Sequence, residues 1–272
     1  MKEKYLFMDL DGTLLNDQKE ITAGNRMAME EALKRGHKII ITTGRPMKSA
    51  ILQAQKLGMD KPGCYMIAYN GAIIYDWASK QKIFTRTLPL ETVRRVFDEV
   101  NRRGMHVQTY DEWDVLVEPR CDDEAVRHYC DLIKMSYRVI QDVHTDVTEE
   151  PVKVLVIDFD KQDGLLEVQN WLRANMADEV DCFFSCDQYL EVVPVGMTKG
   201  FAVKALCEVL NVPIENAIAV GDAGNDLSMI EAAGVGVAMA NGTDEVKAIA
   251  DWITTRDNNH DGIAQVIERF MS

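Results

Sequence analysis

The most constraining feature of this 272-residue chain is its start, where a short apolar run leads directly into two aspartates. Residues 4–8 have the pattern of one buried strand, and Asp9 and Asp11 follow with a single residue between them. Because side chains alternate along a strand, residues i and i+2 can share a side, so both carboxylates can converge where the strand ends. Two carboxylates held that close repel each other unless a cation lies between them. The pattern therefore favours a site for a hard divalent cation with oxygen ligands, such as Mg²⁺.

Two other structures could carry the same stretch. Asp11-Gly12 is a common turn dipeptide, so a surface turn is one alternative. An EF-hand loop that starts at Asp9 would have Glu20 at its twelfth position, as required, but Leu14 instead of glycine at its sixth. The apolar run before Asp9 also indicates a strand, whereas a helix precedes an EF-hand loop. We therefore reject the EF-hand interpretation.

The next segments alternate between helix and strand patterns, which is typical of a parallel sheet. A helix is predicted over 21–35, a buried strand over 38–43 and a second helix over 47–57. Ligands of such sheets bind at the carboxyl ends of the strands. We therefore expect Thr43 and Gly44 to lie at the same edge as the two aspartates, where a hydroxyl and an N–H suit a phosphate oxygen.

The dipeptide Asn70-Gly71 separates two strand-like runs within residues 65–75, which predicts a β-hairpin. The simplest interpretation of Asn70 is therefore a turn residue, and contact with a substrate is the alternative. Arg45 has two alternatives of the same kind, because it can add positive charge to the site or pair with a structural carboxylate.

The pattern changes after residue 84. A helix predicted over 90–100 is followed by paired strand-like runs with helices between them, which indicates a separate α+β layer. We predict that residues 1–84 and 189–272 form one domain and that residues 85–188 form a second domain inserted into it.

Two later segments carry further polar groups. Lys199 falls in the first turn of a predicted helix, where a cation is disfavoured unless anions lie close to it. The small-residue strand 216–220 leads into Asp222, Asn225 and Asp226 at the start of another helix. Carboxylate and amide oxygens at such a junction can bind a metal ion, and the helix N-terminus favours an anion.

Taken in order, these four segments resemble the four motifs of the haloacid-dehalogenase-like (HAD) phosphotransferase superfamily, and the insertion resembles the type IIB cap of Cof-like HAD phosphatases. The resemblance implies an α/β fold with a Rossmann-like, doubly wound parallel-sheet core for catalysis. It also implies that the inserted α+β cap domain determines substrate specificity.

The resemblance further implies a role for each site residue. Asp9 would be the nucleophile that forms an aspartyl-phosphate, and Asp11 would protonate the leaving oxygen and later activate water. Mg²⁺ would be held by Asp9, Asp222 and the backbone carbonyl of Asp11. The phosphate-binding residues would be Leu10, Thr43, Gly44, Lys199 and Asn225. The supporting or substrate-contacting residues would be Arg45, Asn70 and Asp226, and direct coordination of the metal by Asp226 stays open.

Composition limits the partners and the location. The net charge of −14 argues against a general nucleic-acid binder, whose affinity depends on neutralising phosphates. No apolar run approaches the ~18 residues of a membrane span, and no signal peptide opens the chain. None of the six cysteines forms a C-x-x-C pair, so we expect reduced thiols and a cytoplasmic protein. The expected partners are a small phosphomonoester and at most further copies of the chain, as a monomer or small homo-oligomer.

The resemblance is strongest to the sugar-phosphate branch, so we predict Mg²⁺-dependent hydrolysis of small phosphomonoesters, most of all sugar phosphates. Pyridoxal phosphate and flavin mononucleotide are alternative substrates. A sugar phosphomutase is another alternative, because it shares the core but returns the phosphoryl group to the sugar. A non-catalytic phospholigand sensor is disfavoured because Asp9 and Asp11 are both present. A protein phosphatase is disfavoured because a large cap restricts access.

Overall fold

The computed structural model describes residues 2–159 and 162–272, which fall into two compact units. The first unit comprises the chain up to Arg45, Ala50–Phe84 and Thr198–Ser272, and the second comprises Pro46–Ser49 and Thr85–Met197. Among the residues described, no helix combines the length and the apolar character needed to cross a bilayer.

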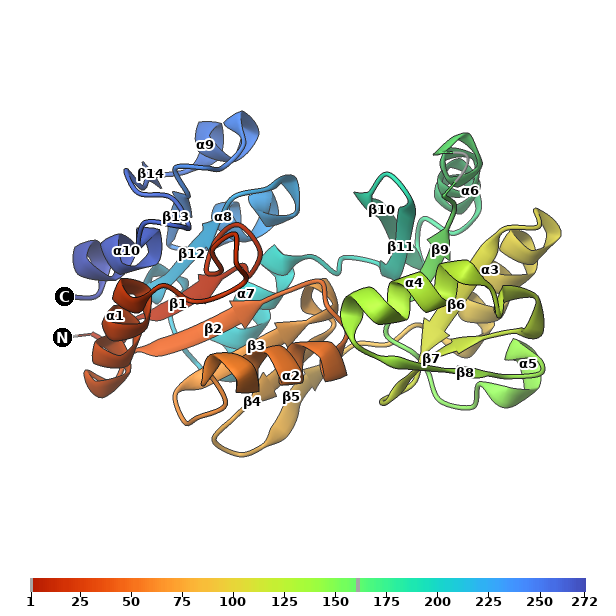
Figure 1. The fold of residues 1–272 in the computed structure, drawn as a ribbon, viewed down its shortest axis with the longest axis horizontal. Helices are drawn as coiled ribbons and strands as arrows, with labels where there is room; N and C mark the ends of the chain where they lie inside the picture. Colours follow the sequence, from red (N-terminus) through yellow and green to blue (C-terminus); the bar gives the residue numbers. More distant parts are fainter. Residues whose placement is uncertain (1, 160–161) are drawn as a thin grey trace. The chain divides into compact units, whose positions relative to one another are not determined.

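In the described part of the chain, the first unit is built on an eight-stranded sheet with the order β14-β13-β12-β1-β2-β3-β4-β5 (Figure 1). Its strands are β1 (Tyr5–Met8), β2 (Lys38–Thr42), β3 (Cys64–Ala68), β4 (Ile73–Asp76), β5 (Gln81–Thr85), β12 (Ala217–Gly221), β13 (Val235–Ala238) and β14 (Trp252–Ile253). The strands from β14 to β3 run parallel to their neighbours. Strand β4 is antiparallel to β3, which confirms the hairpin predicted around Asn70.

Helices pack on this sheet in the order that a doubly wound fold requires. They are α1 (Ala23–Lys34), α2 (Met47–Leu57), α7 (Lys199–Val209), α8 (Leu227–Ala232), α9 (Asp244–Ile249) and α10 (Gly262–Phe270). Tyr5 and Phe7 of β1 point to one face, where they belong to a buried cluster with residues of α7 and α8. Helix α1 packs against α10. The α/β core with a parallel sheet predicted from the sequence is confirmed.

The position of β1 in the sheet locates the site. Strand β1 lies between β12 and β2 and is parallel to both, so the carboxyl ends of the three strands meet at one edge. Asp9, Thr43 and Asp222 directly follow these three strands. Every residue of β1 is buried, as expected for an apolar strand in the middle of a parallel sheet.

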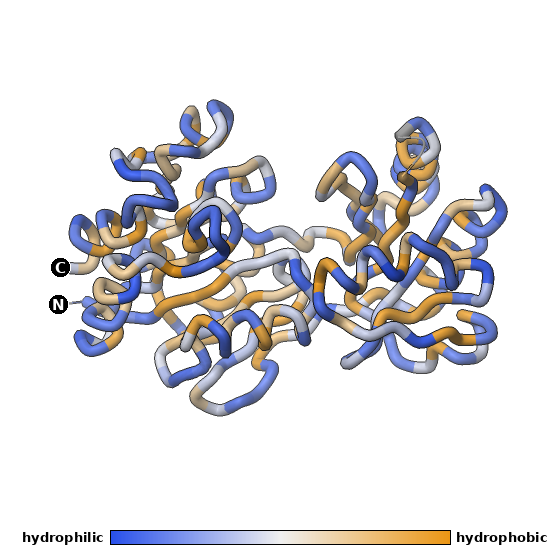
Figure 2. Tube along the Cα trace, in the orientation of Figure 1, coloured by the Kyte–Doolittle hydropathy of each residue, from blue (hydrophilic) through white to orange (hydrophobic). Residues whose placement is uncertain are grey.

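The second unit is a six-stranded sheet with the order β10-β11-β9-β6-β7-β8 in the residues described. Its strands are β6 (His106–Tyr110), β7 (Asp114–Val117), β8 (Ser136–Val139), β9 (Val154–Ile157), β10 (Val180–Cys186) and β11 (Tyr189–Pro194), and its helices are α3 (Leu90–Arg102), α4 (Glu124–Ile133), α5 (Val143–Asp146) and α6 (Gln162–Asn175). Figure 2 shows that polar and apolar residues alternate along these helices. In α3 the apolar residues Val93, Val96, Phe97 and Val100 are buried.

The structure contradicts the boundary expected between residues 188 and 189. Strand β11 pairs with both β9 and β10, so it belongs to the second sheet and the second unit continues to Met197. Residues 189–193 are as apolar as a core strand and directly precede the helix with Lys199, so the sequence pattern did not distinguish the two sheets. The short strand β8 and helix α5 were not predicted either, because most residues of β8 are exposed and its pattern is polar.

Candidate active site

The site is built around Asp9, the first residue after β1. The backbone N–H of Asp9 donates a hydrogen bond to the carbonyl of Val220 (3.2 Å), which continues the pairing of β1 with β12 by one step. The side chain is buried, with 8% of the residue exposed. Its Oδ1 lies 2.5 Å from Nζ of Lys199.

Lys199 lies in the first turn of α7 and is almost completely buried, with 1% exposed. Its ammonium donates hydrogen bonds to Oδ1 of Asp9 (2.5 Å) and to Oδ1 of Asp226 (2.6 Å). Burial alone would lower the pKa of Lys199, but the two carboxylates outweigh it and hold that pKa above its ordinary value. The lysine is therefore charged, and its position at a helix N-terminus is stabilised by these anions.

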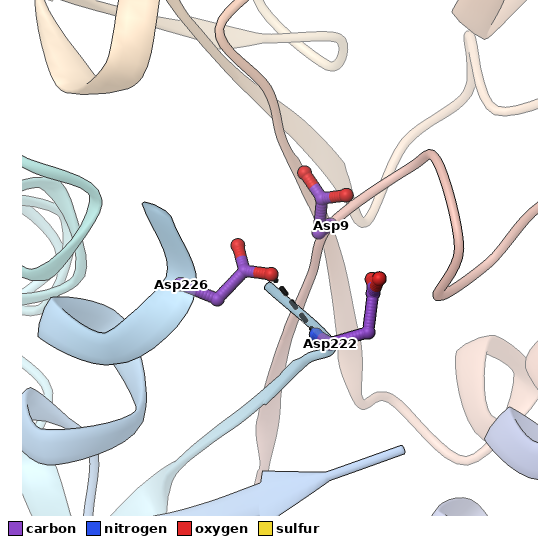
Figure 3. Close-up of side chains that lie close together, drawn as sticks. All are labelled: Asp9, Asp222 and Asp226. Carbon is purple, nitrogen blue, oxygen red and sulfur yellow. Dashed lines mark hydrogen bonds between the residues drawn. The ribbon is translucent and has the colours of Figure 1, made fainter. Parts of the chain in front are cut away.

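Asp226 holds both this lysine and the loop after β12. It ends the short turn η4 (Gly224–Asp226), and its Oδ2 accepts hydrogen bonds from the N–H groups of Asp222 (3.0 Å) and Ala223 (3.1 Å). Figure 3 shows the first of these bonds. Its Oδ1 accepts the bond from Lys199. Both oxygens of Asp226 are thus engaged in fixing Lys199 and the backbone at Asp222.

Asp222 is oriented by the stretch that follows Asp9. The hydroxyl of Thr13 donates a hydrogen bond to Oδ1 of Asp222 (2.6 Å), and Thr13 is fully buried. Gly12 has a positive φ of +86°, and a Cβ added there would lie only 2.4 Å from Oδ2 of Asp222. Sequence reasoning missed the contact of Thr13, although its place beside Gly12 in the first motif was a usable signal.

The charges in this group are unbalanced. One carboxylate oxygen from each of Asp9, Asp222 and Asp226 lies within 4.8 Å of the others (Figure 3), against the single ammonium of Lys199. Burial raises the pKa of Asp9 to about 7, and the charges of Asp226 and Asp222 act in the same direction, against Lys199. Burial also raises the pKa of Asp222. A divalent cation would remove this excess negative charge, so the donor set fits Mg²⁺.

Two of the three carboxylates suit direct coordination. Both oxygens of Asp226 already accept hydrogen bonds, whereas Asp9 and Asp222 accept the bonds from Lys199 and Thr13 through Oδ1. The close approach of Gly12 to Asp222 leaves room for no side chain at residue 12. These observations fit Asp9 and Asp222 as the protein carboxylates of a metal site.

The carboxylate of Asp11 lies outside this group. Its Oδ1 accepts a hydrogen bond from Nζ of Lys19 (2.7 Å), and its Oδ2 accepts one from Nη2 of Arg45 (3.0 Å). Burial acts to raise the pKa of Asp11, but the bonds to Lys19 and Arg45 outweigh it and hold that pKa below its ordinary value. Sequence reasoning did not single out Lys19.

The loop after β2 brings Thr43, Gly44 and Asn70 together. The backbone N–H of Asn70 donates to the carbonyl of Thr43 (3.1 Å), and the hydroxyl of Thr43 accepts the N–H of Arg45 (3.2 Å). A Cβ at Gly44 would lie 3.0 Å from Oδ1 of Asn70, so the Asn70 amide lies directly against this loop. Asn70 has a left-handed backbone (φ +54°), as expected of the turn residue in the predicted hairpin.

The two remaining predicted residues differ in exposure. Asn225 lies on η4 and is exposed. Leu10 is buried, and its carbonyl accepts the N–H of Leu15 (2.8 Å).

Comparison with known proteins identifies the family of this chain. The family model for haloacid dehalogenase-like hydrolases matches residues 6–267. A haloacid dehalogenase-like hydrolase from Bacteroides thetaiotaomicron is 35% identical with a TM-score of 0.88, covering 98% of this chain and 99% of that one. The HAD subclass IIB sugar phosphatase BT4131 is 26% identical with a TM-score of 0.80, covering 98% of both chains.

Two curated relatives are similar over nearly their whole length. The 5-amino-6-(5-phospho-D-ribitylamino)uracil phosphatase YitU of Bacillus subtilis is 29% identical, with 100% of this chain and 98% of YitU covered. The pyridoxal phosphate phosphatase YbhA of Escherichia coli is also 29% identical, with 98% of both chains covered. The resemblance suggested by the four sequence motifs is confirmed, and the chain belongs to the haloacid dehalogenase-like hydrolase family.

Proposed function

We propose that this protein is a Mg²⁺-dependent phosphatase that hydrolyses small phosphomonoesters, most of all sugar phosphates, through an aspartyl-phosphate on Asp9. One observation carries the proposal. The Lys199 ammonium is buried between Asp9 and Asp226, and Asp222 lies within the same group of carboxylates. A fixed positive charge beside a carboxylate nucleophile suits phosphoryl transfer, which requires positioning and charge neutralisation above all.

The reaction divides between two aspartates. A carboxylate oxygen of Asp9 bonds to phosphorus while the ester P–O bond breaks, and Asp11 gives a proton to the leaving oxygen. Asp11 then takes a proton from water as the water oxygen attacks phosphorus, and the bond between Asp9 and phosphorus breaks. This sequence releases the alcohol first and phosphate second.

The surrounding residues hold the phosphoryl group. Mg²⁺ bound by Asp9 and Asp222, with the backbone carbonyl of Asp11, would neutralise negative charge on the reacting group. Lys199 would add a second positive charge beside Asp9, and its bond to Asp226 keeps it in place. Phosphate oxygens would be bound by Leu10, Thr43, Gly44 and Asn225. Asn70 supports the Thr43–Gly44 loop through its backbone bond to Thr43 (3.1 Å).

The choice of sugar phosphates is supported by the likeness to the sugar phosphatase BT4131 over the whole chain. YitU and YbhA have similar identities, and their names give a ribitylaminouracil phosphate and pyridoxal phosphate as substrates. Those two esters are therefore the first alternatives. The six cysteines are unpaired thiols, which supports a place in the reducing cytoplasm.

The proposal is tested by phosphate release with Mg²⁺ across sugar phosphates, pyridoxal phosphate, the ribitylaminouracil phosphate, flavin mononucleotide and nucleotides. Wild type would be compared with Asp9→Asn, which keeps the shape of the side chain but removes the nucleophile. Asp60→Asn, on an exposed loop of the same unit, is the matched control. We expect release by wild type and Asp60→Asn, and none by Asp9→Asn or with a chelator. Release by Asp9→Asn at the wild-type rate would overturn the proposal, and isomerisation without release would indicate a mutase.

A further inference from the structure

The carboxylate of Asp11 is held at both oxygens by two different cations. Nζ of Lys19 lies 2.7 Å from Oδ1, and Nη2 of Arg45 lies 3.0 Å from Oδ2. All three side chains are partly exposed, at 57% for Lys19, 29% for Arg45 and 42% for Asp11. Ion pairs this exposed contribute little to folding, so stability alone gives little reason for the arrangement.

The backbone around Lys19 is fixed by a compact turn. The N–H of Asn16 donates a hydrogen bond to the carbonyl of Glu20 (2.9 Å), and the carbonyl of Asn16 accepts one from the N–H of Lys19 (2.9 Å). The side-chain Oδ1 of Asn16 accepts the N–H groups of Gln18 (3.0 Å) and Glu20 (2.9 Å). Lys19 itself has a left-handed backbone (φ +60°). The Asn16 side chain therefore sets the direction from which Lys19 reaches Asp11.

The segment that carries this turn is also anchored from outside. Nδ2 of Asn241 donates to the carbonyl of Gly12 (2.7 Å), and Nδ2 of Asn258 donates to the carbonyl of Leu15 (2.9 Å). The N–H of Asp17 donates to Oδ1 of Asn259 (3.0 Å). None of these bonds involves the side chain of Lys19, so a substitution there removes its contact with Asp11 and leaves the loop in place.

We propose that Lys19 is a positioning residue for the acid–base group of the reaction, acting with Arg45 to fix the plane of the Asp11 carboxylate. This inference rests on the proposed function, in which Asp11 gives a proton to the leaving oxygen. A carboxylate with a single partner can rotate about its side-chain bonds, whereas two charged hydrogen bonds to different oxygens define its orientation. General acid catalysis requires that orientation, because the proton must lie within hydrogen-bond reach of the leaving oxygen. The two cations favour the ionised carboxyl, so their contribution to this step is orientation and not proton affinity.

The test uses two esters that differ in their need for a proton. A sugar phosphate releases a strongly basic alkoxide, which requires protonation, whereas p-nitrophenyl phosphate releases a weakly basic phenolate, which does not. The ratio kcat/KM reports the steps up to formation of the aspartyl-phosphate, so it isolates the step in which Asp11 acts as the acid. The variants are Lys19→Met and Lys19→Arg, with Lys56→Met as the control at an exposed lysine of α2.

We expect Lys19→Met to lower kcat/KM for the sugar phosphate about 10-fold, a fraction of the roughly 10²–10⁴-fold that a general acid contributes. For p-nitrophenyl phosphate it should change kcat/KM less than about 2-fold, since that step needs no acid. Lys19→Arg should recover most of the loss, and Lys56→Met should match wild type with both esters.

Equal losses with both esters would overturn the positioning role, because a general defect of structure or phosphate binding does not depend on the leaving group. No loss with either ester would also overturn it. Failure of the wild type to hydrolyse any ester would instead contradict the proposed function itself.

Discussion

Gly12 and Asp222 lie so close that no side chain fits at residue 12. A Cβ there would be 2.4 Å from Oδ2 and 2.9 Å from Cγ of Asp222, and φ of Gly12 is +86°. These two residues are 210 positions apart in the chain, and they can be in contact at the site only because Gly12 has no side chain. Gly12 lets the loop after Asp9 pass directly over the carboxylate that we assign to the metal.

Gly12→Ala should therefore abolish Mg²⁺ binding and phosphatase activity, because the new methyl group displaces the Asp222 carboxylate. Gly36→Ala is the matched control, because its φ is also positive (+91°) but no described atom lies within 4 Å of where its Cβ would be. The control should cost only the backbone strain of roughly 1–2 kcal/mol and keep its metal affinity. Calorimetric titration with Mg²⁺ measures both, and equal affinities in the two variants would contradict the role of Gly12.

Asp226→Asn should destabilise the fold as well as reduce activity. The substitution removes one of the two carboxylates that bond to the buried Lys199 ammonium. Breaking a buried ion pair from one side costs about 3–5 kcal/mol when the remaining charge is left alone. Asp9 still pairs with Lys199, so the loss should lie at or below the lower end of that range. Urea unfolding in the absence of Mg²⁺ measures the loss. Asp244→Asn, at an exposed position in the first turn of α9, serves as the control. If both variants changed the free energy of unfolding by a similar small amount, the buried bond between Asp226 and Lys199 would not be important for stability.

Mg²⁺ should stabilise the wild-type protein. The three carboxylates exceed the single ammonium in charge, so a divalent cation binds the folded site in preference to the unfolded chain. At a concentration about 100 times the dissociation constant the gain is about 2.7 kcal/mol. Thermal unfolding with and without Mg²⁺ should show this increase in the wild type and lose most of it in Asp222→Asn. An equal shift in both proteins would place the binding elsewhere.

Stability should fall in mild acid partly because of His37. This residue is buried, its Nδ1 accepts the backbone N–H of Lys4 (3.0 Å), and burial holds its pKa below the usual range. The unfolded chain therefore takes up a proton more readily than the folded one, so this contribution is complete above about pH 6.5 and is lost as the pH falls below it.

His37→Asn keeps an acceptor close to the position of Nδ1 but cannot be protonated. It should reduce the loss in melting temperature between pH 7 and pH 5.5. Gln55→Asn, at an exposed residue of α2 without a titratable group, should leave that loss unchanged. Identical pH dependence in wild type and His37→Asn would show that other groups cause the acid sensitivity.

Much of the first unit could be predicted because its motifs directly follow strands. Once β12, β1 and β2 are parallel neighbours, Asp222, Asp9 and Thr43 must meet at one edge. The buried position of Lys199 was also foreseeable in outline, since a lysine in the first turn of a helix requires anions close by. The order and direction of the strands are therefore enough to predict that these carboxylates lie close together.

The features that the sequence did not predict depend on individual contacts. Lys19 reaches Asp11 from the Asn16 turn, in which the backbone of residue 19 is left-handed. The hydrogen bond from Thr13 to Asp222 joins two segments that are far apart in the sequence, and their positions relative to each other depend on tertiary packing. Strand β11 has a core-like sequence, and only its pairing with β9 and β10 places it in the second sheet.

The most direct test of the account is chemical trapping of the phosphoenzyme. Protein would be mixed with the ³²P-labelled ester that gives the fastest phosphate release, quenched in acid after a single turnover and digested for mass analysis. Asp11→Asn should accumulate more label than wild type, because it lacks the group that activates water for the second step. The account predicts a phosphoryl group on Asp9 in both proteins and none in Asp9→Asn. Rapid phosphate release without any labelled protein, or a label on another residue, would contradict it.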